Sequence, residues 1–318
     1  MYDVMQDVMQ GNATDDQIKT LLTQMAERGE AVSEITGAAR VMREMATTIK
    51  APKMALDCCG TGGDGSGTYN ISTAVALVSA ACGVPVAKHG NRAASSQSGA
   101  ADVLEALGVN LEMDVPRLES ALRLHNFCFL MAPRHHQAMK HVITVRKEIG
   151  KRTIFNLLGP LANPAGTQFQ LIGVYDMKWL RPMAEVLKNL GSQRAWIVHG
   201  RDGLDEISTT AETDIAILDE GTITEKTITP SDFGLEISRP DEITGGDAKE
   251  NAQALKALLN GERNAYRDIV LVNASAVLNI HGKTNDLKEG VKLAAEAIDD
   301  GKALKVLENY IAFSKEES

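Results

Sequence analysis

Hydrophobic and polar positions divide the chain into a helical beginning, an alternating middle and a helical end. Residues 1 to about 48 show helical spacing, with Thr14 as an N-cap before one helix, Gly29 at its end, and Ser33 with Glu34 at the start of the next. This stretch has no alternating pattern typical of a strand. It therefore predicts a small helical domain.

From Lys53 onward, short apolar runs alternate with helical segments. The predicted strands are 54–57, 84–88, 127–131, 169–175 and 195–199, and the predicted helices between them are 70–82, 100–108 and 178–190. Such alternation indicates a parallel sheet covered by helices. The predicted fold class is α/β, with a small N-terminal α-helical domain and a larger α/β domain that has a mainly parallel central sheet.

Three segments depart from this alternation. Helices predicted at 134–149 and 153–158 follow one another without a strand, so we expect about 134–165 to return to the N-terminal helices. Residues 211–245 are rich in turns and predict a few antiparallel strands, and the rest of the chain is mostly helical. The predicted domains are 1–48 for the helical domain, and 52–133 with 166–318 for the α/β domain.

Composition and charge narrow the range of partners. The chain has 318 residues, and its 33 Lys and Arg against 42 Asp and Glu give a net charge of -9. This balance disfavours nucleic acid, whose affinity comes from basic residues, but allows a local basic pocket. The most apolar stretch, 74–87, is too short to span a bilayer. The four cysteines lack ligand-like spacing and the first residues lack a secretory pattern, so we expect free thiols and a cytoplasmic protein.

A glycine-rich loop lies between the first predicted strand and the helix after it. The segment DCCGTGGDGSGTYNIST begins at Asp57 and holds five glycines. Glycines let backbone N–H groups approach an anion, and the N-terminus of the following helix also favours phosphate. The loop predicts phosphate binding, with a long mobile turn as the alternative. Asp64 would accept a hydrogen bond from a ribose hydroxyl or hold a metal.

A second polar loop, KHGNRAASS, follows the next predicted strand. Lys88 and Arg92 supply cations, and Ser95 and Ser96 supply hydroxyl and N–H donors. By itself the segment is typical of a solvated basic turn. Beside the first loop, at the carboxyl ends of parallel strands, it would line the crevice where α/β proteins usually bind ligands.

Two adjacent carboxylates follow the strand predicted at 195–199. Asp205 and Glu206 lie in GRDGLDEIS. Neighbouring side chains of a flat strand point to opposite faces, so the two can share a metal only at a bend, which Gly200 and Gly203 favour. Magnesium prefers carboxylates combined with phosphate oxygens. A solvated acidic turn is the alternative, and it is the more common reason for such a pair.

Together these segments resemble the anthranilate phosphoribosyltransferase family. The likeness rests on DCCGTGGDGSGTYNIST, KHGNRAASS, RTIFNLLGPLANP and DGLDEIS in that order, with RDIVLVNASAVLNIHGK and AAEAIDDGKAL after them. It implies transfer of the phosphoribosyl group of phosphoribosyl pyrophosphate (PRPP) to the amine of anthranilate, with release of pyrophosphate. This is the second step from chorismate to tryptophan. It also implies Mg²⁺, as two ions of which one arrives with PRPP, and a homodimer formed through the helical domain.

The resemblance carries over to particular positions. It implies PRPP binding by Gly60, Gly63, Asp64, Thr68, Asn70, Ile71, Ser72, Thr73, Lys88, His89, Gly90, Asn91, Arg92, Ala93, Ala94, Ser95, Ser96 and Ala100. It implies anthranilate contacts from Gly60, Asn91 and Arg146, with His136 and Pro160 lining the approach, and magnesium ligands at Ser72, Asp205 and Glu206. No residue is expected to act as a catalytic acid or base, because positioning and electrostatics would carry most of the rate.

Two departures from the family pattern bear on these expectations. The family often has a serine where this chain has Ala100, so one phosphate contact is expected to be missing or mediated by water. The chain also has fewer residues before Gly11 than the family pattern, which bears on the first helix and the dimer surface.

Two other functions remain open on the residues alone. A pyrimidine nucleoside phosphorylase-like enzyme shares this fold, but KHGN and DGLDE argue against it. A non-catalytic relative that binds nucleic acid would need a basic surface, which the net charge of -9 does not favour.

Overall fold

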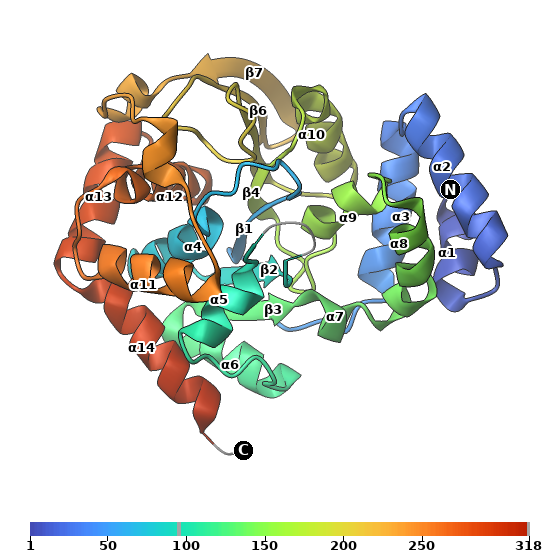
Figure 1. Cartoon of the computed structure of the whole chain (residues 1–318), viewed down its shortest axis with the longest axis horizontal. Helices are drawn as coiled ribbons and strands as arrows, with labels where there is room; N and C mark the ends of the chain where they lie inside the picture. The colour runs from blue at the N-terminus through green and yellow to red at the C-terminus, as the bar shows by residue number, and fades with distance from the viewer. Residues whose placement is uncertain (94–96, 317–318) are drawn as a thin grey trace.

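The computed structural model describes residues 1–93 and 97–316 (Figure 1). Three helices begin the chain, and they lie together at one side of the molecule: α1 (Tyr2–Gln10), α2 (Asp15–Arg28) and α3 (Val32–Glu44). The predicted N-cap of α2 is confirmed, since the Thr14 side chain accepts a hydrogen bond from Gln17 N at 3.3 Å.

A seven-stranded sheet forms the centre of the larger part. Its order is β3-β2-β1-β4-β5-β6-β7, parallel from β3 to β5 and antiparallel from β5 to β7. The strands are β1 (Leu56–Gly60), β2 (Val86–Gly90), β3 (Phe127–Met131), β4 (Phe169–Gly173), β5 (Arg194–Gly200), β6 (Thr213–Asp219) and β7 (Thr222–Ile228). The predicted fold class is therefore confirmed, and so are the predicted antiparallel strands after residue 211.

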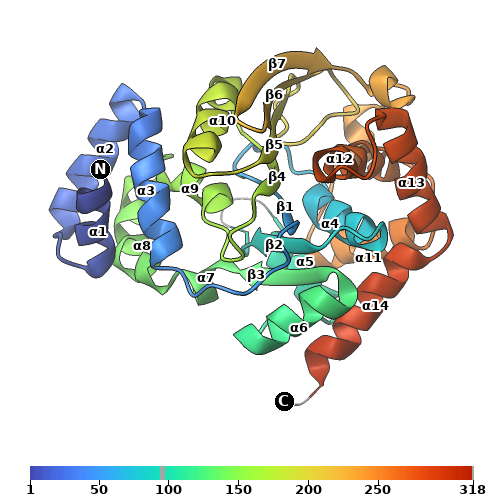
Figure 2. The same cartoon turned by 180° about the vertical axis from the view of Figure 1, so that it is seen from behind.

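Helices cover both faces of the sheet (Figure 2). Neighbouring residues of one strand serve opposite faces: Leu171 and Trp196 belong to one buried cluster, and Ile172 and Ile197 to the other. The first cluster includes α4 (Ile71–Ala81), α5 (Ala100–Ala106), α6 (Val115–His125), α11 (Ala248–Leu259), α12 (Ala265–His281), α13 (Leu287–Asp299) and α14 (Lys302–Lys315). The second includes α10 (Leu180–Asn189), which follows the short 3-10 helix η2 (Met177–Trp179), and the N-terminal helices. Where both faces are buried, a strand can be a continuous apolar run, as in β3 (FCFLM), whereas β7 at the edge is largely exposed.

The segment after β3 returns to the N-terminal helices. It contains α7 (Ala132–His135), η1 (Gln137–His141), α8 (Ile143–Ile149) and α9 (Phe155–Leu161), and its apolar residues join the cluster of α1–α3. The predicted single helix over 134–149 is wrong. The backbone leaves helical geometry at His136, with φ -118° and ψ 62°, where its ring is buried against that of His89. The domain boundaries themselves stay a prediction.

Two further 3-10 helices, η3 (Pro230–Phe233) and η4 (Pro240–Ile243), connect β7 to α11. No helix within residues 1–93 and 97–316 combines the length and the apolar character needed to cross a membrane. All four cysteines are unpaired.

Candidate functional site

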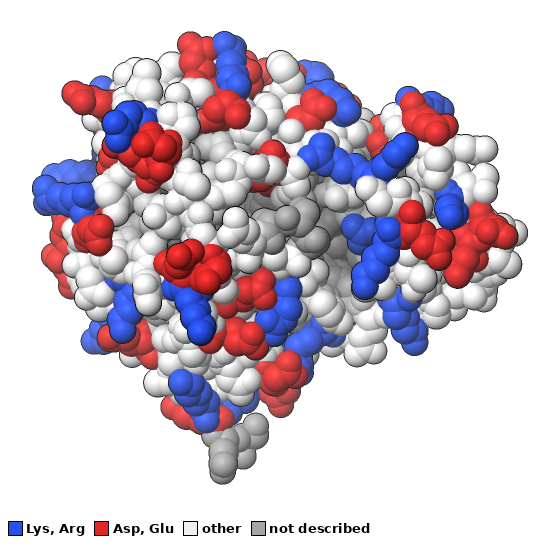
Figure 3. Space-filling model, in the orientation of Figure 1, with Lys and Arg blue, Asp and Glu red and all other residues white. Residues whose placement is uncertain are grey.

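The two polar loops meet at one edge of the sheet because β1 and β2 are parallel neighbours. Asn70 joins them: its amide nitrogen lies 3.3 Å from the main-chain oxygen of Ser98, which follows the second loop. Figure 3 shows a hollow at this place, between the helical part and the α/β part, with Lys and Arg side chains on its helical side. The structure therefore brings the two predicted binding segments together.

Main-chain hydrogen bonds hold the first half of the glycine loop against the ends of β1 and β4. Thr61 N donates to Gly173 O at 2.9 Å, and Tyr175 N donates to the Thr61 hydroxyl at 3.0 Å. Gly62 and Gly63 follow with φ of 67° and 75°, a conformation that favours glycine. These positive φ angles explain why glycines occupy positions 62 and 63.

The second half of the glycine loop is held by a segment that the sequence did not indicate. Gly245 N donates to Gly67 O at 2.9 Å, and Tyr69 N donates to Ile243 O at 3.2 Å. Asn251, only 2% exposed, donates to the Asn70 side-chain oxygen at 2.9 Å. Because these contacts use main-chain groups and an ordinary helix asparagine, no local pattern could have revealed them.

The acidic turn lies on the ends of β1 and β4. It bends at the expected glycines, since Gly200 N donates to Leu204 O at 2.9 Å and Gly203 has φ 98°. Gly62 N donates to Asp205 Oδ2 at 2.7 Å, which ties this turn to the glycine loop. A Cβ on Gly60 would lie 2.2 Å from the same oxygen, so a side chain there would displace the Asp205 carboxylate.

The electrostatics of this turn favour a bound cation. Burial raises the pKa of Asp205 to about 6, and Asp64 adds repulsion. Burial and the charge of Asp205 likewise raise the pKa of Glu206, whereas Lys88 and a main-chain hydrogen bond from Ser72 lower it. Two carboxylates that repel each other in a shielded place have the chemistry of a site for Mg²⁺.

The described residues do not enclose a metal by themselves. No group of three or more His, Cys, Asp and Glu side chains among them is arranged to hold an ion. Magnesium usually completes its shell with water and substrate phosphate oxygens, so Asp205 and Glu206 fit such a shared site. The Ser72 hydroxyl, also predicted as a ligand, lies 3.1 Å from Lys88 Nζ.

Lys88 is buried beneath the site, at 2% exposure, where its ammonium donates to Cys58 O at 2.8 Å. Below it lies Asp57, a fully buried carboxylate that the sequence did not single out for the site. Asp57 accepts hydrogen bonds from His89 N at 3.1 Å and from Asn163 Nδ2 at 2.7 Å. These bonds fix the second loop to β1 and to the segment that returns from the helical part.

Two neutral histidines border the helical side of the hollow. The rings of His89 and His136 have centroids 5.1 Å apart, and burial lowers their pKa values to about 3 and about 4. His89 Nδ1 lies 3.1 Å from Gly159 O, next to the predicted contact Pro160, which is buried in α9. The structure thus places His136 and Pro160 on the same side of the site.

Arg146 is a partly buried cation on α8. Its guanidinium carbon lies 5.3 Å from the centre of the Phe155 ring, and burial lowers its pKa. It forms no ion pair within the described ranges 1–93 and 97–316. An arginine without a carboxylate partner is suited to a substrate carboxylate.

Arg92, in the second loop, differs from Arg146 because its guanidinium is already paired with carboxylates. It lies 3.0 Å from Asp102 and 2.8 Å from Glu105, and Ala93 N donates to Asp102 Oδ2 at 2.9 Å. Asn91 lies beside it, and its main-chain oxygen accepts from Ala101 N at 3.2 Å. These contacts shape the second loop.

The remaining predicted residues lie in the loops and at the ends of the elements around the site. Ile71 and Thr73 are buried in α4, and Thr68 pairs with Thr244 as an isolated bridge. Gly90 ends β2, where a Cβ would lie 2.7 Å from the Phe129 ring. Ala100 is the first residue of α5. The Asp64 carboxylate accepts a hydrogen bond from the Ser66 hydroxyl. Ala94, Ser95 and Ser96 lie outside the described residues.

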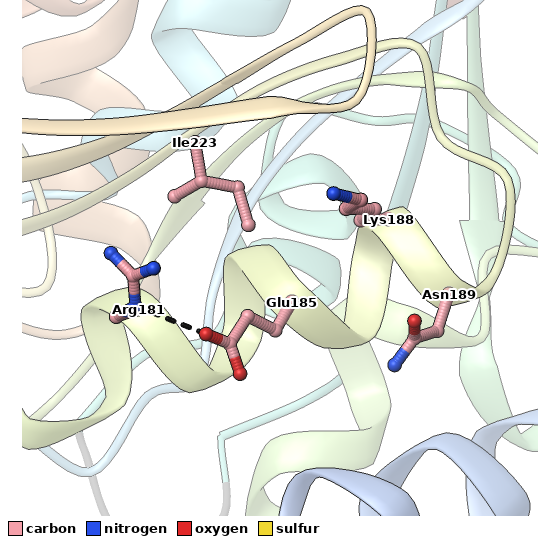
Figure 4. A pocket seen from close by; sticks show the side chains of 5 residues that line it. All are labelled: Arg181, Glu185, Lys188, Asn189 and Ile223. Carbon is pink, nitrogen blue, oxygen red and sulfur yellow. Dashed lines mark hydrogen bonds and ion pairs between the residues drawn. The ribbon is translucent and has the colours of Figure 1, made fainter.

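A separate surface pocket lies between α10 and β7 (Figure 4). Its lining includes Arg181, Glu185, Lys188, Asn189 and Ile223. Arg181 is paired with Glu185 at 3.0 Å and with Glu225 at 2.8 Å. Its charge is thus already compensated, and the pocket adds nothing to the site.

Comparison with known proteins defines the class first. The glycosyl transferase family, helical bundle domain, matches residues 1–46, and the glycosyl transferase family, a/b domain, matches residues 52–304. The anthranilate phosphoribosyltransferase of Azospirillum brasilense is 57% identical over 96% of this chain and 86% of its own length. That of Rhodospirillum rubrum is 56% identical over 96% and 88%.

Comparison with solved structures points to the same family as these relatives. The anthranilate phosphoribosyltransferase of Thermus thermophilus superposes with a TM-score of 0.94 at 45% identity, covering 99% of this chain and 94% of that one. The Saccharomyces cerevisiae enzyme in complex with PRPP and Mg gives 0.88 at 30% identity, covering 98% and 90%. This chain belongs to the anthranilate phosphoribosyltransferase family. It is an enzyme that transfers a phosphoribosyl group to anthranilate, a reaction of tryptophan biosynthesis.

Proposed function

We propose that the glycine loop, the second loop and the acidic turn together transfer the phosphoribosyl group of PRPP to anthranilate and release pyrophosphate. The observation that carries this proposal is the hydrogen bond from Gly62 N to Asp205 Oδ2, at 2.7 Å. It joins a loop suited to phosphate with a carboxylate suited to a metal. The yeast relative, whose structure contains PRPP and Mg, supports the same pairing of ligands.

PRPP would bind across the two loops. Main-chain N–H groups of Gly60 and Gly63 and of the start of α4 would supply donors, and helix α4 adds the partial positive charge of its N-terminus. In the second loop the N–H groups of His89 and Ala93 are already bonded to Asp57 and Asp102, so this loop would contribute mainly side chains. The buried ammonium of Lys88 would add positive potential at the phosphates and would orient the Ser72 hydroxyl through their hydrogen bond. Ser95 and Ser96 belong to this set by family resemblance.

Asp205 and Glu206 would hold Mg²⁺, with Ser72 close by and the remaining ligands supplied by pyrophosphate and water. We infer two ions, one of them carried by PRPP. When bound, magnesium supplies charge stabilisation for the departing pyrophosphate. The chain's own part is to place two carboxyls beside the glycine loop; burial and mutual repulsion raise the pKa of both, and Lys88 offsets part of that rise. A bound cation would favour their ionised forms.

Anthranilate would enter from the helical side. Arg146 would pair with its carboxylate in a bidentate contact, while Gly60 and Asn91 border the amine and His136 and Pro160 line the approach. A yeast relative has been solved with 4-fluoroanthranilate, which supports a site for this ring in the family. The aromatic amine is already neutral at physiological pH, so this site needs to position it rather than remove a proton first.

The assembly that we infer is a cytoplasmic homodimer formed through the helical domain. Val4 on α1 is 44% exposed and Met45 at the end of α3 is 37% exposed, so this part presents apolar surface. Light scattering of the purified protein tests the dimer. A Val4→Glu variant should shift it towards the monomer, whereas Gln253→Glu, at an exposed position on α11 outside the helical domain, serves as a control that adds the same charge.

The decisive test uses the fluorescence of anthranilate, which is lost on transfer. We expect loss only when PRPP and Mg²⁺ are both present. Loss without either component, or absence of any loss together with phosphorolysis of thymidine or uridine, would contradict the proposal.

A further inference from the structure

Arg152 connects the helical side of the site to the glycine loop. It lies in the short segment between α8, which ends at Ile149 and is capped by Gly150 with φ 61°, and α9, which begins at Phe155. Its guanidinium donates a hydrogen bond to Gly63 O and lies 4.0 Å over the ring of Tyr175. No other arginine or lysine side chain of the described residues donates a hydrogen bond to the main chain between Gly60 and Asn70.

Tyr175 is itself fixed to the start of the same loop. Its main-chain N–H donates to the Thr61 hydroxyl at 3.0 Å, and its own hydroxyl accepts from Trp179 Nε1 at 2.9 Å. The ring is therefore a rigid platform under the Arg152 guanidinium. Planar stacking of this kind suits arginine and not lysine.

The contact at Gly63 sets the orientation of one peptide in the loop. In a planar trans peptide, the C=O of Gly63 and the N–H of Asp64 point in opposite directions. Gly63 has φ 75° and Asp64 belongs to a run of glycines, so little else restrains this peptide. By holding the carbonyl, Arg152 directs the Asp64 N–H away from itself.

We propose that Arg152 is a positioning residue that presents the Gly63–Asp64 peptide to the pyrophosphate of PRPP. The inference rests on the proposed function, and it assigns Arg152 no contact with the substrate. Ordering this peptide before PRPP arrives removes part of the entropy cost of binding. Loss of Arg152 should therefore weaken PRPP binding more than anthranilate binding.

The test compares the KM values of both substrates in Arg152→Ala, Arg152→Lys, Tyr175→Leu and the double variant Arg152→Ala/Tyr175→Leu. Arg152 is exposed, so its variants should fold, which the thermal midpoint checks. Lys151→Ala, an exposed neighbour of the same charge, is the matched control and should resemble wild type.

We expect the PRPP KM of Arg152→Ala to rise about tenfold, the value of one charge-assisted hydrogen bond, with anthranilate KM within about twofold of wild type. Arg152→Lys should lie closer to Arg152→Ala than to wild type. Tyr175→Leu should raise the PRPP KM in the same direction, and the double variant should be no worse than Arg152→Ala, because both remove one interaction.

Three results would overturn the inference: an unchanged PRPP KM in Arg152→Ala, rescue by lysine, or additive losses in the double variant. Rescue by lysine would show a simple charge contact with phosphate. If the wild type is active and the Arg152 variants have an unchanged PRPP KM, only this inference is contradicted. If the wild type shows no PRPP-dependent loss of anthranilate fluorescence, the proposed function itself is contradicted.

Discussion

Gly173 and Asp205 lie so close that a Cβ on Gly173 would stand 1.5 Å from the main-chain oxygen of Asp205. Gly173 is the register partner of Gly60, whose own Cβ would meet the Asp205 carboxylate. The acidic turn therefore rests directly on the ends of two adjacent parallel strands. Its position depends on two residues that have no side chain.

Gly173→Ala should displace the acidic turn. Because the added carbon overlaps a backbone oxygen, Asp205 must move, and its distance from the glycine loop must change. We expect kcat to fall by about a hundredfold, as small misplacements of a positioning group can cost this much. The half-saturating Mg²⁺ concentration should rise. A folded variant, judged by circular dichroism, that titrates with Mg²⁺ like wild type would contradict this.

Asp205→Asn combined with Glu206→Gln should lower kcat and weaken the dependence on magnesium, since both charges for the metal are removed. Without Mg²⁺ the thermal midpoint should not fall, because burial and mutual repulsion raise the pKa of both carboxyls and disfavour their charged forms. Glu212→Gln, which removes an exposed charge nearby, is the control. An unchanged magnesium titration in the double variant would remove the metal role.

The parallel part of the sheet could be predicted from the sequence because its strands are short, mostly apolar runs between helices. The apolar run FCFLM predicts a strand at 127–131, which are the observed bounds of β3, and Phe127 to Leu130 are all buried. The helix over 134–149 was wrong because a buried ring at His136, whose partner His89 is distant in sequence, overrides local helical spacing. Tertiary contacts of this kind leave no local pattern.

The candidate site, like the fold, could be predicted from the sequence only in part. The glycine loop and the pair Asp205–Glu206 could be singled out because their chemistry lies in residue type. Asp57, Asn251 and Arg152 could not, because each acts through main-chain or side-chain partners brought near by the fold. The sequence predicts Arg92 as a cationic donor of the second loop, whereas in the structure it is paired with Asp102 and Glu105.

Arg146→Ala should raise the anthranilate KM far more than the PRPP KM. The guanidinium is partly buried, stacked against Phe155, and unpaired within the described chain, so its loss removes a charge-assisted contact without releasing a partner. We expect a rise of about tenfold or more. Lys147→Ala removes the neighbouring exposed charge and serves as the control. Equal changes in both KM values would refute the assignment.

The buried, neutral His136 should make the protein less stable towards acid. Burial lowers its pKa from 6.5 to about 4, so below about pH 6.5 the unfolded chain binds a proton that the folded chain does not. The free energy of unfolding should therefore fall as pH decreases from about 6.5 to about 4, by on the order of 3 kcal/mol from this group. The raised pKa of Asp205, about 6, acts with the opposite sign and is common to variant and wild type. Urea unfolding of wild type and His136→Gln should show a difference in stability that is constant above about pH 7 and shrinks on acidification. A difference independent of pH would show that His136 is not held neutral.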